Sequence, residues 1–141
     1  MRSLIDNRNL GTVYDALVNA LTKRCGVRLL TQDFSLAAYQ NLERNLKSVD
    51  KATIVIPGRA SENGVWNAQI GLAGNATERR FRNTLLLPAV ANRLADWIAH
   101  KTEVKLSATP ITQNLLHLHF DEAGDAVIHG SSPFTAGGLG L

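Results

Sequence analysis

Two histidines and a short run of small hydroxyl residues near the end of the chain are the residue types best suited to chemistry on phosphate. His117 and His119 lie two positions apart in an apolar stretch that predicts a strand over residues 115–120. Side chains at that spacing point to the same face of a strand. A Gly-Ser-Ser run at residues 130–132 follows a second predicted strand, residues 126–129. If the two strands form a hairpin, we expect the serines to return beside the imidazoles, where backbone amides also bind anions well.

The elements that must position these residues begin with a helix and a strand in alternation. Apolar residues recur every four positions from Val13 to Leu21, which predicts a helix with Thr12 as N-cap and Gly26 as its stop. A short buried strand is expected at residues 27–31, a second helix at residues 35–46, and a β-branched strand at residues 52–57. This order predicts parallel pairing through helical crossovers.

The middle of the chain is less regular. Residues 58–75 contain four glycines and weak periodicity, so a long loop is expected, in which Trp66 either anchors a lid or packs over the edge of the core. Thr77 is expected to cap a helix that carries Arg79, Arg80 and Arg82, and Pro88 to begin a new one. The stripe at residues 90, 94, 97 and 98 predicts a buried helix face, followed by a strand at residues 103–107.

Together these elements predict an α/β fold, with a mixed, largely parallel sheet flanked by helices in a single domain over residues 1–141. The length suits one core, and 45% hydrophobic residues argue against disorder. The net charge of +3 permits a phosphate-bearing partner without requiring one. A single cysteine, Cys25, excludes an internal disulfide and favours a reducing compartment. With no signal-peptide core and no membrane-length apolar run, we expect a cytoplasmic protein without membrane contact.

The order of motifs resembles the phospholipase D superfamily. Residues 114–119, Asn-Leu-Leu-His-Leu-His, followed by a strand and by Gly130-Ser131-Ser132-Pro133-Phe134-Thr135, resemble that family's H-x-K and G-S-x-N-F-T motifs. The segments Leu-Ile-Asp-Asn-Arg at residues 4–8, Gly-Thr-Val at residues 11–13 and Gly-Leu-Gly at residues 138–140 are similar to the phospholipase-D-like domains that head some bacterial SNF2-type helicases and defence proteins. The resemblance covers nearly the whole chain and implies the single-motif half of that fold.

The resemblance implies a metal-independent phosphodiesterase, most plausibly a nuclease, that needs no cofactor. His117 would be the nucleophile or the acid, with His119 in the lysine position, and a phosphohistidine would form during the reaction. Ser131 and Ser132 would contact phosphate together with Gly130 and Thr135. Single-motif members of the family dimerise, so a homodimer or a subunit of a larger complex is expected. DNA is expected over RNA as the partner, with Arg79, Arg80 and Arg82 as candidate backbone contacts unless they form a solvated helix face.

Three departures from the family pattern bear on catalysis. His119 replaces a lysine, and Pro133 replaces an asparagine and offers no backbone N–H. The family's acidic position falls on Gly124, with Asp125 one place away. Losing a phosphate-binding cation and an amide weakens transition-state stabilisation, so we expect weakened or lost catalysis. The chain stops at Leu141, where relatives continue, so both a truncated chain and a shortened member that needs a partner are open.

Several readings of the histidines therefore remain open. They could be structural strand residues, an active phosphodiesterase site, or an inherited pocket that binds without cutting. A metal site built from His117, His119, Asp121 and His129 is a further alternative, although its spacing fixes no third ligand. At the level of the protein, the alternative to an enzyme is a non-catalytic nucleic-acid-binding or assembly subunit, or a pure scaffold. The glycines at residues 137–140 predict a flexible tail rather than a phosphate loop, because no lysine and helix follow them.

Overall fold

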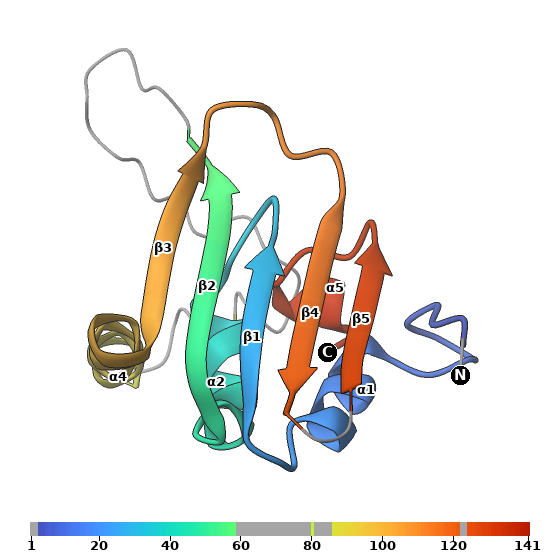
Figure 1. Ribbon diagram of the computed structural model, residues 1–141, viewed down its shortest axis with the longest axis horizontal. Helices are drawn as coiled ribbons and strands as arrows, with labels where there is room; N and C mark the ends of the chain where they lie inside the picture. The colour runs from blue at the N-terminus through green and yellow to red at the C-terminus, as the bar shows by residue number, and fades with distance from the viewer. Residues whose placement is uncertain (1–2, 59–79, 81–85, 122–123) are drawn as a thin grey trace.

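The computed structural model describes residues 3–58, 80, 86–121 and 124–141. In this part of the chain, five strands form one sheet in the order β3-β2-β1-β4-β5 (Figure 1). The strands are β1 (Cys25–Leu30), β2 (Val49–Pro57), β3 (Thr102–Ser107), β4 (Asn114–Phe120) and β5 (Gly124–Gly130), and the helices are α1 (Val13–Ala20), α2 (Leu36–Leu46), α4 (Leu87–Lys101) and α5 (Ala136–Leu139).

The sheet is mixed, as the sequence predicts. β1 pairs in parallel with β2, and β2 with β3, through the crossover helices α2 and α4. β4 pairs antiparallel with both β1 and β5. The expectation of a largely parallel sheet thus holds for only half of the pairings. Three residues separate the end of β4 from the start of β5, and a connection of that length permits only antiparallel neighbours.

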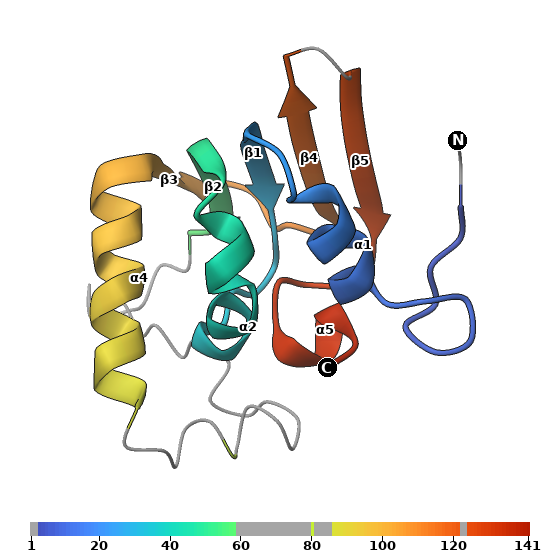
Figure 2. The same cartoon turned by 90° about the horizontal axis from the view of Figure 1, so that it is seen from below.

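The helices cover one face of the sheet, and in the described chain no helix covers the other (Figures 1 and 2). The burial of β1 alternates accordingly, because Cys25, Val27 and Leu29 are buried whereas Arg28 is exposed. We call the uncovered side the open face. Given the strand registers, the residues that face this side include Gly26, Arg28, Leu30, Lys51, Thr53, Val55, Glu103, Lys105, Leu115, His117, His119, Asp125, Val127 and His129.

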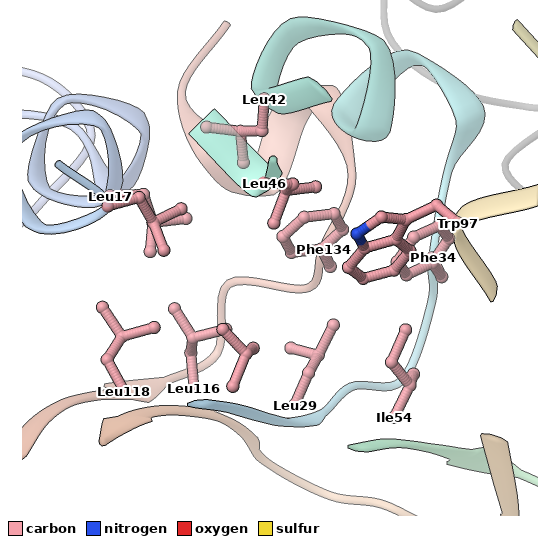
Figure 3. A pocket seen from close by; sticks show the side chains of 12 residues that line it. Leu17, Leu29, Phe34, Leu42, Leu46, Ile54, Trp97, Leu116, Leu118 and Phe134 are labelled. Atoms are coloured by element: carbon pink, nitrogen blue, oxygen red, sulfur yellow. The ribbon is translucent and has the colours of Figure 1, made fainter. Parts of the chain in front are cut away.

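The core lies between the sheet and the helices, and Leu17, Leu42 and Leu118 are among its fully buried residues. A small cavity of about 20 Å³ lies within it, and Figure 3 shows the side chains that surround this cavity, with Leu116 and Leu118 rising from β4 toward α1 and α2. All residues that line this cavity are apolar or aromatic. The volume would hold about one water molecule, and the lining offers it too few polar partners, so we exclude this cavity as a ligand site.

The predicted helix starts are confirmed, and one predicted helix end is wrong. Thr12 Oγ1 accepts from Asp15 N, and Ser35 Oγ accepts from Ala38 N, so both side chains act as N-caps. Gly26 does not stop α1, which ends at Ala20. Gly26 instead belongs to β1, because the turn after α1 is completed before Cys25.

The predicted flexible tail is also wrong. Residues 136–139 form α5, in which Ala136 and Leu139 are buried against the core. Thr135 caps this short helix by accepting from Gly138 N. A Cβ atom at Gly138 would collide with the carbonyl oxygen of Pro133, so glycine here permits close packing. The glycines that predicted flexibility therefore allow the chain end to fold tightly onto the domain.

The remaining predictions concern the middle of the chain. Trp66 and the helix expected after Thr77 lie outside the described residues. α4 begins with Pro88 in its first turn and buries Val90 and Leu94, as its stripe predicts. Among the helices that the structure describes, none is both long and apolar enough to cross a bilayer.

Candidate functional site

His117 and His119 lie on the open face of β4, which confirms that the two side chains share one face. Their neighbours Leu116 and Leu118 point into the core and are 8% and 1% exposed. In the β1–β4 register His117 lies opposite Arg28, and in the β4–β5 register it lies opposite Val127. The alternation of apolar and imidazole side chains along β4 thus presents both histidines on the uncovered side of the sheet.

The carboxylate of Asp125 lies within hydrogen-bond distance of both imidazoles. His117 Nε2 lies 2.8 Å from Asp125 Oδ2, and His119 Nδ1 lies 2.7 Å from Asp125 Oδ1. Asp125 is two residues into β5 and directly opposite His119, which brings its two oxygens within reach of both rings. Asp125 lies one place from the acidic position of the motif, but this bridge is not visible in the sequence, because it depends on the hairpin register.

The bridge has a definite electrostatic consequence. Hydrogen bonds from His119 and then from His117 lower the pKa of the Asp125 carboxyl, and they outweigh the opposing effect of desolvation. The His117 side chain is 18% exposed and that of His119 is 58% exposed, so solvent reaches mainly the second ring. The cluster of His117, His119 and Asp125, here called the imidazole bridge, is therefore a surface feature rather than the wall of a pocket.

The imidazole bridge does not form a metal centre. Among the described residues, no group of three His, Cys, Asp or Glu side chains has a geometry that could hold a metal ion. Asp121 reaches only to 3.8 Å from His119 Nε2. His129 lies near the other end of β5, where its Nε2 is 2.6 Å from Gln113 Oε1. The residues of the metal-site alternative are thus spread along the hairpin.

The Gly-Ser-Ser-Pro-Phe-Thr loop runs away from the histidines, so the expected convergence is wrong. Phe134 is 6% exposed, stacks on Phe34 with ring centroids 4.9 Å apart, and lies in the core beneath the helix-covered face. Ser132 Oγ is 3.5 Å from Asn7 Nδ2, on the N-terminal segment. Ser131 is exposed where the chain leaves β5. The apolar Phe134 draws the loop to the side of the sheet opposite His117.

The residue that the hairpin sets beside this loop is Asn114. Asn114 pairs with Gly130, whereas His117 lies three residues further along β4. Asn114 Oδ1 accepts from Gln32 N at 2.8 Å and lies 3.1 Å from Thr31 Oγ1, which itself accepts from Phe134 N at 2.9 Å. Counting pairs back from the turn could have indicated this residue, but the exact turn length is not visible in the sequence.

The position of Asn114 matters for the resemblance, because the loop motif and the strand motif must meet for phosphate chemistry. Asn114 is 5% exposed, and its Nδ2 atom has no partner among the described residues. An amide cannot act as a nucleophile toward phosphorus in the way that an imidazole does. The strand residue nearest the serines is therefore a structural hydrogen-bonding residue.

Of the three arginines considered for nucleic acid, Arg80 is exposed, and Arg79 and Arg82 lie outside the described residues. On the open face, Arg28 and Lys51 are exposed and form no ion pair with any described residue. Lys105 on the same face pairs with Glu103 at 3.4 Å. No sequence signal marks Arg28 and Lys51, because their exposure depends on a sheet face that no described helix covers.

Comparisons with protein-family models, with curated proteins and with solved structures found no match for this chain.

Proposed function

We propose that this chain is a nucleic-acid-binding domain of phospholipase-D-like type, in which catalysis is weakened or lost, and that its open face is the binding surface. The observation that carries the proposal is a sheet face that no described helix covers, with three imidazoles and with Arg28 and Lys51, which form no ion pair with a described residue. A sheet with helices on both faces buries both of them, whereas a sheet with helices on one face offers its other face to solvent or a ligand.

The chemistry of the open face suits a nucleic-acid strand. Arg28 and Lys51 can each neutralise a phosphate, and the guanidinium and imidazole planes can stack on exposed bases. Arg28 lies directly beside His117 in the β1–β4 register, so a stacking group and a cation are neighbours. Glu103 is compensated by Lys105, and Asp125 accepts from His117 and His119. These pairings support attraction of phosphate by the face despite its two carboxylates.

The placement of the two motifs supports the proposal that catalysis is weakened or lost. The imidazole bridge and the serine loop occupy opposite faces, and Asn114 stands beside the loop instead of a histidine. Neither arrangement brings a nucleophile and phosphate-binding donors to a common point, which catalysis by this class requires. The resemblance to helicase-associated domains makes DNA the expected ligand, with a larger defence or helicase complex as the setting.

The proposal is tested with labelled single-stranded DNA, duplex DNA and RNA of one sequence, by fluorescence anisotropy over a salt series. We expect binding that weakens as salt rises, and a further loss of about tenfold in Arg28→Glu. Arg44→Glu makes the same charge change on an exposed position of α2, on the helix side of the sheet, and serves as the matched control. Equal losses in the two variants, or no binding at low salt, would contradict the open face as the surface.

A metal-independent phosphodiesterase is the second candidate, and one contact favours it. A carboxylate that orients an imidazole, as Asp125 does for His117 at 2.8 Å, is a common way to prepare a nucleophilic or basic histidine. Cleavage of DNA or RNA in the presence of EDTA, abolished in His117→Ala, would support it. Cleavage that survives His117→Ala, or no cleavage between about pH 5 and about pH 8, would leave binding or assembly as the function.

A further inference from the structure

β5 is an edge strand whose sequence is chemically symmetric about its centre. In the described chain its inner side pairs with β4, and no strand lies along its outer side. Its sequence is Gly-Asp-Ala-Val-Ile-His-Gly, with Val127 at the centre. An apolar residue lies on each side of Val127, and a glycine lies at each end of the strand. Between them, Asp125 and His129 occupy equivalent positions on the two sides. An unpaired edge presents backbone N–H and C=O groups that a second strand can satisfy.

A strand with such a sequence can pair with a second copy of itself about a two-fold axis. In an antiparallel pair of two β5 strands centred on Val127, each Asp125 lies opposite the partner's His129, and the two Val127 residues lie opposite one another. Both pairs project from the open face, because residues 125, 127 and 129 share it. A carboxylate can accept a hydrogen bond from an imidazole directly opposite it, and an apolar cross-strand pair stabilises a sheet. A strand that complements itself in this way fits an isologous dimer.

The exposure of β5 is consistent with a covered edge. Val127, at the centre of the strand, is 57% exposed on the open face beside the unpaired edge. Natural edge strands are often protected by proline, lysine or a bulge, and β5 carries none of these. Its one carboxylate, Asp125, already accepts hydrogen bonds from His117 and His119 within its own copy.

The N-terminal segment adjoins the same edge. Figures 1 and 2 show residues 3–12 on the outer side of β5, and this segment includes Leu4 and Leu10, which are 73% and 58% exposed. A second copy laid along β5 would therefore also meet this segment, whose exposed apolar side chains could be covered together with Val127.

We propose that β5 pairs antiparallel with β5 of a second copy of this chain, centred on Val127, so that the two sheets become one continuous sheet. A two-fold axis perpendicular to the sheet places both open faces on the same side. Dimerisation by this edge stands independently of nucleic-acid binding and would double the surface that the open face offers.

The test is sedimentation velocity of the full chain over a dilution series, without nucleic acid. We expect a reversible dimer, and a dissociation constant raised about tenfold or more in Val127→Lys, because two ammonium groups then lie directly opposite. Leu106→Lys is the matched control, since Leu106 is 54% exposed on the other edge strand, β3. Circular dichroism confirms that each variant is folded. A monomer at every concentration, or equal effects of both substitutions, would overturn the proposal.

A cysteine scan tests the register itself. Only a residue on the two-fold axis lies opposite its own copy, so Val127→Cys should form an intermolecular disulfide when incubated with oxidised glutathione. Leu106→Cys places an equally exposed thiol on β3 and should remain largely unlinked, while the native Cys25 is buried. Efficient cross-linking of Leu106→Cys, with little of Val127→Cys, would show that the wrong edge has been assigned.

Discussion

At the scale of single residues, Asp125 decides how the two histidines behave. Its carboxylate accepts from His117 and His119 at once, and these two contacts tie the beginning of β5 to the end of β4. A bare pair of histidines on a strand would be free to bind a ligand or an ion. The contacts with Asp125 instead hold both rings in place on the open face, with His119 the more accessible of the two.

The lowered pKa of Asp125 predicts a specific pH dependence. A carboxyl whose folded pKa lies below its unfolded pKa stabilises the fold above the unfolded value, and this contribution is lost as the pH falls through the folded value. We therefore expect the native chain to lose more stability on acidification below about pH 4 than Asp125→Asn, which lacks this carboxyl. Thermal unfolding followed by circular dichroism across that range measures the difference.

The control for this prediction lies in the same hairpin. Asp121 is 98% exposed and only weakly placed toward His119, so Asp121→Asn should keep the native acid sensitivity. If Asp125→Asn and the native chain show identical acid profiles, the imidazole bridge contributes nothing to the stability of the hairpin.

At the scale of elements, β4 shows how one strand serves two purposes. Leu116 and Leu118 fill the core beneath α1 and α2 (Figure 3), while His117 and His119 stand on the open face. The alternation is read directly from the sequence, because side chains of a strand point to opposite faces with a period of two. The sequence cannot show that one of those faces would remain uncovered.

Two neighbouring substitutions on β4 test this division. Leu118 is 1% exposed, so Leu118→Ala should lower the free energy of unfolding by about 2–5 kcal/mol through lost burial and a new cavity. His119→Ala, one residue away on the open face, should cost much less stability while changing nucleic-acid binding. Urea denaturation compares the two variants. Comparable losses of stability would mean that the open face is as tightly packed as the core.

The helices illustrate which element boundaries a sequence predicts well. Thr12 and Ser35 act as N-caps as expected, because a cap is a local contact between a side chain and the backbone three residues on. Gly26 failed as a helix stop, and the glycines at residues 137–140 failed as a tail signal. A glycine in a sequence can indicate either a flexible backbone or a place where two backbone segments approach closely. Which of the two applies depends on the residues that pack around it in the fold.

At the scale of the whole molecule, Asn7 joins the two ends of the chain. Its Nδ2 donates to Gly138 O at 2.9 Å, and its Oδ1 accepts from Val13 N at 2.8 Å. Asn7 has a positive φ of 58°, which asparagine tolerates better than most residues. One side chain thus fastens the N-terminal segment to the start of α1 and to α5.

This contact predicts the effect of removing it. Asn7→Ala loses both hydrogen bonds and keeps a strained backbone, so we expect a loss of about 1–3 kcal/mol in the free energy of unfolding. Asn9→Ala, two residues later at an exposed position, is the matched control and should change stability little. Chemical denaturation gives the energies, and limited proteolysis shows whether the N-terminal segment is released. If Asn7→Ala unfolds at the same denaturant concentration as the native chain, other contacts hold the N-terminal segment in place.

The sequence was sufficient for those features that depend on near neighbours along the chain. The α/β class, the crossover helices, the capping residues and the shared face of His117 and His119 all follow from local periodicity and capping chemistry. Each of these features depends only on how a residue is oriented relative to residues two to four positions away in a helix or a strand. The same information also indicated that hydroxyl residues follow a β-hairpin.

What needed the folded molecule was every relation between distant segments. The placement of β4 beside β1, the pairing of Asn114 rather than His117 with Gly130, and the burial of Phe134 on the far side of the sheet all depend on non-local contacts. A shift of register by one residue reverses all side chains of a strand, and the register is chosen by which arrangement buries the most apolar surface. That choice separated the serines from the imidazoles and left one face of the sheet uncovered.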